Sequence, residues 1–288
     1  MGQFSFCRVS LPGLLLSLAS LFVLDGCAGS QPSAGNNTAM SSVTGTSPTV
    51  KKQYSVQNAH SHNDYEQPHY FEDAYKAGFG SMEADIYLVD GALLVAHNKK
   101  DIDPRRSLAS MYLQPLANIV KINKGYPYKN HKAELELLID LKDPKDSPAY
   151  KKAVALIVSY KALADSKKLR ITFTGNIPSD SVMAVAKGLF YFDGVPGRTY
   201  SEAAQKRIYM LSDNFASYTN WQGEGAIEKE DYQKLRRTVL ATHQIGKKIR
   251  FWNAPDNQNA WILMEKLAVD YINTDKIDSL AAFLREKN

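Results

Sequence analysis

Short runs rich in β-branched and aromatic residues alternate with longer amphipathic runs along most of this 288-residue chain. Runs with the length and composition of strands lie at 55–59, 81–87, 92–96, 135–141, 170–174, 207–211, 249–252 and 271–274, and a further short run at 190–192 could add one more. Helical patterns lie between most of them, for example at 147–164, 227–244, 257–267 and 277–285. Alternation of this kind predicts an α/β fold with a parallel sheet, and a count near eight predicts a TIM (β/α)8 barrel.

One connection departs from the alternation. Asp90–Gly91 lies between the second and third predicted strands, and Asp-Gly is a turn signal, so these two strands should be joined tightly without a helix. The segment 99–132, with a helical stretch at 108–122, then forms an insertion after the third strand that would lie above the barrel. The three tyrosines of this insertion either line a substrate cleft or pack the insertion itself; they are Tyr112, Tyr126 and Tyr128.

The first residues have the pattern of a secretory leader. Arg8 precedes an apolar run at 11–24 that is too short for a membrane span. Residues 24–27 then resemble a bacterial lipobox, in which Cys27 is lipidated after cleavage. We therefore predict a lipoprotein of the bacterial cell envelope, anchored through Cys27, or a secreted protein if that cysteine is not lipidated. An ordinary leader cut near Ala28 is the alternative.

The predicted organisation is a signal peptide at 1–26, a flexible tether at 27–50 that is rich in Ser, Thr, Gly, Asn and Pro, and a barrel at 51–288. The two cysteines both precede the predicted barrel, which excludes a disulfide and a thiol nucleophile from it. The formal net charge of +5 suits an anionic substrate or a lipid headgroup. Basic residues are not clustered with aromatic ones, so we predict no nucleic-acid partner.

Acidic residues lie at the ends of two predicted strands. Glu83 and Asp85 alternate with Ala84, so both carboxylates point to the same side of their strand. Two inward like charges are costly unless a cation lies between them. Asp140 ends another strand and would supply a third oxygen ligand, because the C-terminal ends of barrel strands converge on one mouth. An all-oxygen set favours Mg²⁺ or Ca²⁺, so we predict one such cation on these three carboxylates.

Two histidines and a lysine accompany these acids. His60 follows the first predicted strand, His97 follows the third, and Lys142 lies two residues beyond Asp140. Each residue alone could be structural, as a satisfied core histidine or a salt-bridged strand end. Titratable groups that gather at a barrel mouth usually mark a site, however. Histidines for proton transfer, a lysine for an anion and carboxylates for a cation together suggest metal-assisted phosphoester chemistry.

The same residues resemble the opening of the glycerophosphodiester phosphodiesterase and phosphatidylinositol-specific phospholipase C superfamily. The resemblance is carried by residues 59–60, 83–85, 90–91 and 95–97. The usual Arg-Gly after the first histidine is replaced by Ser-His-Asn-Asp-Tyr at 61–65, which looks like the branch that includes the altered-inheritance-of-mitochondria proteins of fungi. Asp140–Leu141–Lys142 also resembles the sphingomyelinase D relatives, and 251–253 and 269–275 resemble the last two strands of the superfamily.

The resemblance implies a TIM barrel that hydrolyses a glycerophosphodiester, a phosphoinositide or a related phosphodiester. It implies His60 and His97 as the acid/base pair, and attack by a neighbouring substrate hydroxyl through a cyclic phosphate. Glu83, Asp85 and Asp140 would hold the cation. The further phosphate or substrate contacts are Lys142, Asn63, Trp252 and His62, of which His62 could equally be a structural hydrogen-bonding residue.

Two other functions remain open. One is a lipid-anchored phosphate-ligand binding protein without turnover. The other takes His60–Ser61–His62 as the H-x-H motif of a phosphoesterase that binds several transition metals, which would need more histidines at strand ends than His97 alone. The predicted partners are a small-molecule or lipid phosphodiester and, through the anchor, a membrane. We predict a monomer.

Overall fold

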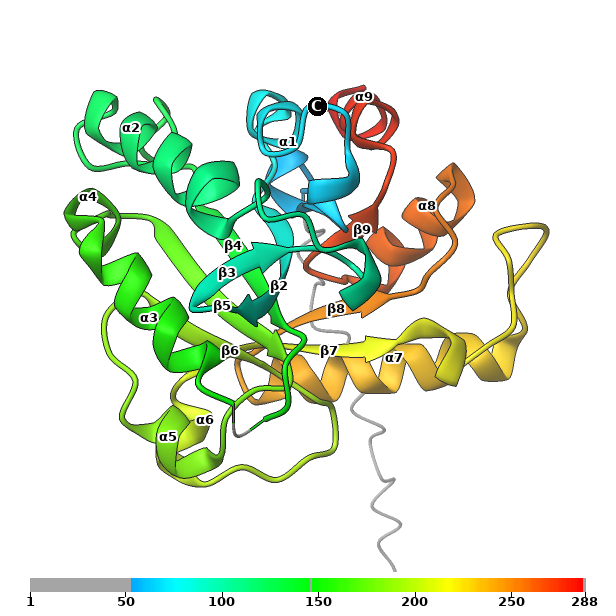
Figure 1. Ribbon diagram of the computed structural model, residues 1–288. Helices are drawn as coiled ribbons and strands as arrows, with labels where there is room; N and C mark the ends of the chain where they lie inside the picture. Colours follow the sequence, from blue (N-terminus) through cyan, green and yellow to red (C-terminus); the bar gives the residue numbers. More distant parts are fainter. Residues whose placement is uncertain (1–52, 146, 287–288) are drawn as a thin grey trace, which may run out of the picture. The chain divides into compact units, whose positions relative to one another are not determined.

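The computed structural model describes residues 53–145 and 147–286, which form a parallel barrel (Figure 1). Its strands are β1 Ala59–Ser61, β2 Ser81–Val89, β4 Leu135–Leu141, β5 Leu169–Gly175, β6 Phe190–Gly194, β7 Ile208–Asn214, β8 Lys248–Trp252 and β9 Ile272–Thr274. Neighbours pair in the order β8-β7-β6-β5-β4-β2-β1-β9. A parallel bridge between Arg250 and Tyr271 brings β8 next to the chain that enters β9. The nearly closed eight-stranded parallel barrel confirms the predicted fold.

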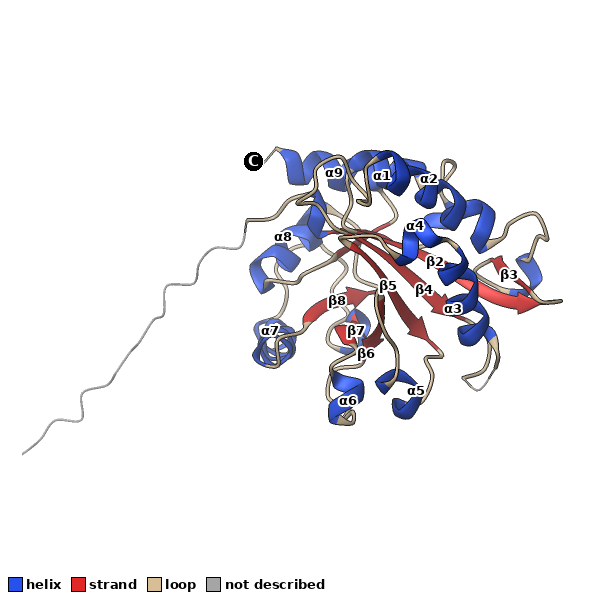
Figure 2. Cartoon of the chain, turned by 90° about the vertical axis from the view of Figure 1, so that its left-hand side faces the viewer, coloured by secondary structure: helices blue, strands red, loops and turns tan. Residues whose placement is uncertain are grey.

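Helices surround the outer face of the sheet (Figure 2). They are α1 Glu72–Ala77, α2 Gln114–Ile122, α3 Ala149–Ser159, α4 Lys161–Ala164, α5 Asp180–Ala184, α6 Glu202–Gln205, α7 Lys229–Gln244, α8 Gln258–Leu267 and α9 Ile277–Arg285. Because both faces of the strands are covered, β4 is almost a continuous apolar run, and most of its residues are buried. None of the helices in the described part of the chain has the length and apolar character needed to span a membrane.

The first strand begins later than the sequence predicted. Residues 56–58 form a 3₁₀ turn rather than a strand, because the Ser55 hydroxyl accepts a hydrogen bond from the Gln57 backbone N–H. The Asn58 side chain in turn accepts from the Ser55 N–H, which completes a capping box. The strand proper is Ala59–Ser61, so His60 lies within it and is completely buried.

One of the strands predicted for the barrel lies outside it, and another strand takes its place. β3, Ala92–Val95, pairs antiparallel with β2 as a hairpin and lies outside the barrel order. The barrel position is taken by β6, at the run predicted only as an additional strand. The tight connection at Asp90–Gly91 is confirmed, with φ of 49° and 79° at its two residues, which is the left-handed geometry of a two-residue hairpin turn.

The segment between β3 and β4 packs against the barrel instead of lying above its mouth. Its helix α2 buries Leu116, Ala117 and Val120, whose spacing places them on one face. Tyr112 and Tyr128 are buried, and their hydroxyls donate to Asp64 Oδ2 at 2.9 Å and to the Phe79 carbonyl at 2.6 Å. Tyr126 stacks on His131. The tyrosines therefore pack the insertion and do not line a substrate cleft.

Candidate active site

A cavity of about 420 Å³ opens at the C-terminal ends of the barrel strands. Nearly all of the predicted chemistry-bearing residues line it or lie directly beneath it. The predicted residues that line it are His62, Asn63, Glu83, His97, Asp140, Lys142 and Trp252. Asp193, Ser212 and Arg250, which the sequence analysis did not single out, line it from the other side of the barrel.

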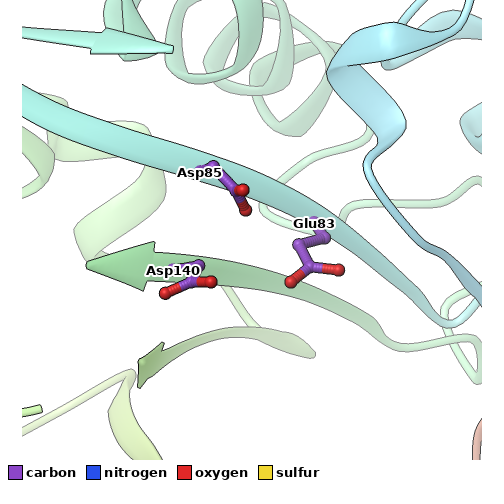
Figure 3. A group of neighbouring side chains, drawn as sticks. All are labelled: Glu83, Asp85 and Asp140. Carbon is purple, nitrogen blue, oxygen red and sulfur yellow. The ribbon is translucent and has the colours of Figure 1, made fainter. Parts of the chain in front are cut away.

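Three carboxylates converge at one wall of this cavity (Figure 3). Glu83 and Asp85 come from β2, and Asp140 from the adjacent β4, where it is the register partner of Asp85. One oxygen from each lies within 4.8 Å of the others. Glu83 and Asp85 are buried, and Asp140 is half-buried. The structure thus brings together the three acids that the strand-end argument placed at one site.

The surroundings of this trio fit a hard divalent cation. Oδ1 of Asp85 and Oδ1 of Asp140 are buried, and neither has a hydrogen-bond partner within the described residues. Burial, with the charges of Glu83 and Asp140, raises the pKa of Asp85 to about 6. Gly175 leaves room at this point, because a Cβ there would lie 1.9 Å from Asp140 Oδ1. Buried acidic oxygens without donors are the groups that a bound cation would satisfy.

Lys142 partly offsets this negative charge. Its Nζ lies 2.8 Å from Asp85 Oδ2 and 2.5 Å from Asp140 Oδ2. Although burial acts in the opposite direction, these two carboxylates raise the pKa of Lys142, so the ammonium stays charged. The ammonium donates to Oδ2 of Asp140 and lies beside Oδ2 of Asp85, whereas Oδ1 of each carboxylate has no donor among the described residues.

His97 lies at the outer end of the acidic trio. It follows the β3 hairpin rather than a barrel strand, and its side chain is 47% exposed. Its Nδ1 lies 3.2 Å from the Tyr65 hydroxyl and 3.3 Å from Asp85 Oδ2. That hydroxyl also lies 2.7 Å from Asp85 Oδ2 and 2.9 Å from Asn63 Oδ1. Tyr65, which the sequence analysis quoted only as part of a motif, therefore holds the ring of His97.

His60 lies at the inner end of the trio, fully buried beneath the cavity. Its Nε2 is 2.9 Å from Arg250 Nη1, which can only donate, and 3.2 Å from Glu83 Oε2, which can only accept. The arginine contact is the shorter one, so we assign Nε2 as its acceptor and place the proton on Nδ1. Nδ1–H then donates to Ser81 Oγ at 2.7 Å, and the Ser81 hydroxyl donates to Glu136 Oε2 at 2.9 Å. Burial, with the charge of Arg250, lowers the pKa of His60 to about 4, so the ring is neutral near pH 7.

Arg250 and Asp193 are the functional candidates that sequence reasoning missed. Arg250 lies in the middle of β8 and is only 3% exposed, and Asp193 lies in β6. Burial raises the pKa of Asp193 to about 7, and its Oδ1 has no partner among the described residues. The available signal was a charged residue inside the otherwise apolar run 249–252, of which only Trp252 had been singled out.

The remaining predicted residues occupy the rim. His62 Nδ1 is 2.9 Å from Asp275 Oδ1, and although burial opposes it, this hydrogen bond and the nearby Glu83 raise the pKa of His62. Asn63 has a left-handed backbone, with φ of 44°. Trp252 is 41% exposed. Cys27, the predicted lipidation site, lies outside the described residues.

A parallel barrel with an acidic trio between two histidines at its mouth has the fold of the barrel phosphodiesterases. A crystal structure of a glycerophosphodiester phosphodiesterase from Parabacteroides distasonis ATCC 8503 matches with a TM-score of 0.52 and 15% sequence identity, covering 81% of this chain and 99% of that chain. Residues 49–196, about half of the chain, match the family model described as AIM6-like phosphodiesterase domain. The chain belongs to this family, which confirms the resemblance noted in the sequence.

Curated relatives carry the name Altered inheritance of mitochondria protein 6. The protein from Eremothecium gossypii is 27% identical over 270 residues, which cover 78% of this chain and 68% of that protein. The protein from Lachancea thermotolerans is 24% identical and is covered over 65% of its length, and the homolog from Arthroderma benhamiae is 23% identical and is covered over 82%.

These relatives correct one prediction. They are fungal proteins and point to a eukaryotic origin, so the prediction of a bacterial cell-envelope lipoprotein with a signal peptide is wrong. That prediction rested on the residues before position 51, which lie outside the part of the chain that the structure describes.

Proposed function

We propose that this protein is a divalent-metal-dependent phosphodiester hydrolase in which His60 and His97 act as base and acid. One observation carries the proposal: the acidic trio, with its two unpartnered oxygens, lies directly between the two histidines. Glu83 Oε2 is 3.2 Å from His60 Nε2, and Asp85 Oδ2 is 3.3 Å from His97 Nδ1. A cation site and two proton-transfer groups are therefore within reach of one substrate phosphate.

The charged residues of the mouth would bind the phosphate. Glu83, Asp85 and Asp140 would hold one Mg²⁺ or Ca²⁺, which when bound supplies Lewis-acid stabilisation of the charge that develops on the phosphate oxygens. Lys142 keeps its ammonium beside these carboxylates and lines the cavity, so it can donate to a phosphate oxygen from the same wall. Trp252, exposed at the rim, would contact the alcohol part of the substrate.

The histidines differ in a way that suits opposite roles. His60 is neutral, and its Nδ1–H donates to Ser81. Its Nε2 carries no proton and accepts from Arg250 in this structure, so once that contact opens it can take the proton of an attacking substrate hydroxyl. His97 is held at Nδ1 and half-exposed, so its Nε2 can donate a proton to the departing alcohol. Attack would form a new P–O bond as the bond to the leaving alcohol breaks, giving a cyclic phosphodiester.

The substrate class follows from this chemistry. An internal attack needs a hydroxyl next to the phosphodiester, as in glycerophosphodiesters and phosphoinositides. The first of these is the substrate class in the name of the Parabacteroides enzyme that shares the fold.

The test is a panel of water-soluble and lipid phosphodiesters, each with and without a vicinal hydroxyl, assayed with Mg²⁺, with Ca²⁺ and with a chelator. Turnover should require a divalent cation and the vicinal hydroxyl, and ³¹P NMR should detect a cyclic phosphate. Asp140→Asn should be inactive, whereas Asp165→Asn, an exposed aspartate on the outside of the barrel, should match the wild type. Binding of phosphodiesters without turnover under any of these conditions would instead support the non-catalytic alternative.

The multi-metal alternative has less support. Among the described residues, the one group of three or more side chains placed to hold a metal contains three carboxylates and no histidine. Histidine-rich sites suit zinc and other transition metals, whereas all-oxygen sites suit Mg²⁺ and Ca²⁺.

A further inference from the structure

Arg250 is a buried cation in the wall of the active-site cavity, next to Glu83 at the inner end of the acidic trio. It lines the cavity, although only 3% of the residue is exposed. It projects from β8, on the far side of the barrel from β2 and β4 along the sheet order. An arginine in such a place requires counter-charges or a ligand, because an unpaired buried charge is costly.

The short hydrogen bonds of Arg250 go to neutral acceptors. Nη1 is 2.9 Å from His60 Nε2, and Nε is 3.0 Å from Ser212 Oγ. The carboxylate oxygens that neighbour it are farther away, with Asp193 Oδ2 at 3.5 Å and Glu83 Oε2 at 3.7 Å. Lys142, by comparison, lies 2.5 and 2.8 Å from its two carboxylates. The positive charge of Arg250 is therefore less closely matched than that of the lysine.

The residue that follows His60 cannot serve as a phosphate contact. Ser61 is completely buried, and its hydroxyl donates to Asp64 Oδ1 at 2.7 Å. Asp64 also accepts from the Phe71 N–H and the Tyr112 hydroxyl, so this group is structural. The guanidinium of Arg250 on β8 reaches the cavity and carries several N–H donors in one plane. It can therefore supply the phosphate contact that Ser61 does not provide.

We infer that Arg250 is a second phosphate-binding side chain of this site, in addition to Lys142, and that its guanidinium donates to a non-bridging oxygen of the substrate phosphate. The inference rests on the proposed function, because it concerns the same cavity. It has a structural consequence for His60. When Nη1 turns to the phosphate, it leaves Nε2 of His60, which the guanidinium covers in this structure, and the substrate hydroxyl can then reach that nitrogen.

The test measures binding of inorganic phosphate to the full chain by calorimetry at saturating Mg²⁺. Arg250→Met should weaken phosphate binding roughly 10- to 100-fold, the usual range for loss of a charge-assisted hydrogen bond. Arg250→Lys should recover part of the lost phosphate affinity, because lysine keeps the positive charge but lacks the planar pair of N–H donors. Arg170→Met is the matched control: it removes another barrel arginine, which lies outside the residues lining the cavity, and should change the affinity less than about 2-fold on the same scale.

The affinity for Mg²⁺, titrated separately, distinguishes a phosphate contact from a structural role. Arg250→Met should bind Mg²⁺ as well as the wild type or better, since it removes a cation 3.7 Å from Glu83. Wild-type phosphate affinity in Arg250→Met, a parallel loss of phosphate and Mg²⁺ binding, or no phosphate binding by the wild-type protein would each overturn the inference. If Arg250→Met does not fold by circular dichroism, Arg250→Lys decides, and wild-type affinity in that variant is the contradicting result.

The two proposals can fail separately. A wild-type protein that binds phosphate through Arg250 and turns over no phosphodiester would reject the proposed function and leave the inference standing. Turnover that persists in Arg250→Met with an unchanged KM would reject the inference and leave the proposed function standing.

Discussion

Two cations at the N-terminal end of the barrel lie against aromatic rings, whereas three carboxylates lie side by side at the C-terminal end. At the N-terminal end, which we call the floor, the Arg170 guanidinium lies 3.7 Å above the Tyr209 ring. Lys248 lies over the same ring and over that of Tyr271, at 5.0 and 4.8 Å. Glu136, deeper in the barrel, accepts hydrogen bonds from Ser81 and Thr172. These contacts offset the cost of burying the charges.

The C-terminal end, or mouth, has the opposite character. Its three carboxylates lie within 4.8 Å of one another, and two of their oxygens lack a hydrogen-bond partner among the described residues. Such an arrangement persists only if the rest of the fold enforces it. The floor therefore stabilises the fold, whereas the clustered carboxylates of the mouth destabilise it in the absence of a cation. Ser81 connects them, because it contacts both His60 and Glu136.

The largest effect is expected from the histidines of the mouth. His97→Ala should lose roughly two to four orders of magnitude in rate on an alkyl phosphodiester, a typical share for a general acid. Much of that loss should disappear with a nitrophenyl leaving group that keeps the attacking hydroxyl, since such a group departs without a proton. His60→Ala should be impaired on both substrates. Equal losses in both variants on both esters, measured as kcat, would reject this division of roles.

The second effect is a pH dependence of stability caused by His60. Its folded pKa of about 4 lies below the ordinary value of 6.5, so the unfolded chain binds more protons between these values. The stability that His60 contributes is present in full above pH 6.5 and is lost as the pH falls toward 4, by about 3 kcal/mol. Urea unfolding of the wild type and of His60→Gln, both in chelator, should diverge by this amount. Parallel curves would contradict the assignment.

A smaller effect is the gain in stability on Mg²⁺ binding, which should depend on acids at the mouth of the barrel and not on acids at the floor. Mg²⁺ at about 100 times its Kd should raise the free energy of unfolding by about 2.7 kcal/mol, because it binds only the native state. Glu83→Gln should lose most of this gain, since it removes a ligand from the mouth. Glu134→Gln, an acid at the floor that pairs with Lys168, should keep it. A Glu83→Gln protein whose melting temperature still rises with Mg²⁺ like that of the wild type would remove Glu83 from the site.

The smallest effect concerns the floor. Arg170→Met should lower the free energy of unfolding by about 1 to 2 kcal/mol, as expected for loss of a partly buried cation–π contact. It should leave kcat, KM and Mg²⁺ affinity unchanged. Chemical denaturation measures the first quantity, and steady-state assays measure the others. A reduced kcat with unchanged stability would reverse the proposed division between floor and mouth.

The barrel fold and the acidic trio could be predicted because each depends on the pattern of residues close together in the sequence. Alternating runs indicated the barrel, and the alternation of Glu83 with Asp85 placed both on one face of a strand, so the third acid could be inferred from Asp140 at a neighbouring strand end. The exchange of β3 and β6 was not predictable in this way. A short apolar run has the same composition whether it pairs inside a barrel or as an outer hairpin, because its partner is not encoded locally.

Arg250 escaped prediction for a related reason. Its contact with His60 joins residues 190 positions apart, and the local sequence around either residue gives no indication of the other. The contact exists because β9 returns to pair with β1 while Tyr271, just before it, bridges to β8. Closure of the barrel, rather than any motif, places the guanidinium beside the histidine.

This closure has a consequence for protein engineering. A fragment that ends at residue 196 would keep both histidines and all three carboxylates in its sequence, yet it would lack the strands that complete the ring. The first and last segments of the described chain are neighbours in space. Tyr54 donates to the Val269 carbonyl, and Arg285 donates to the Ala77 carbonyl. A circular permutant opened at the exposed Gly188, on the floor side, would therefore preserve every strand pairing. We therefore expect the permutant to fold and the fragment not to.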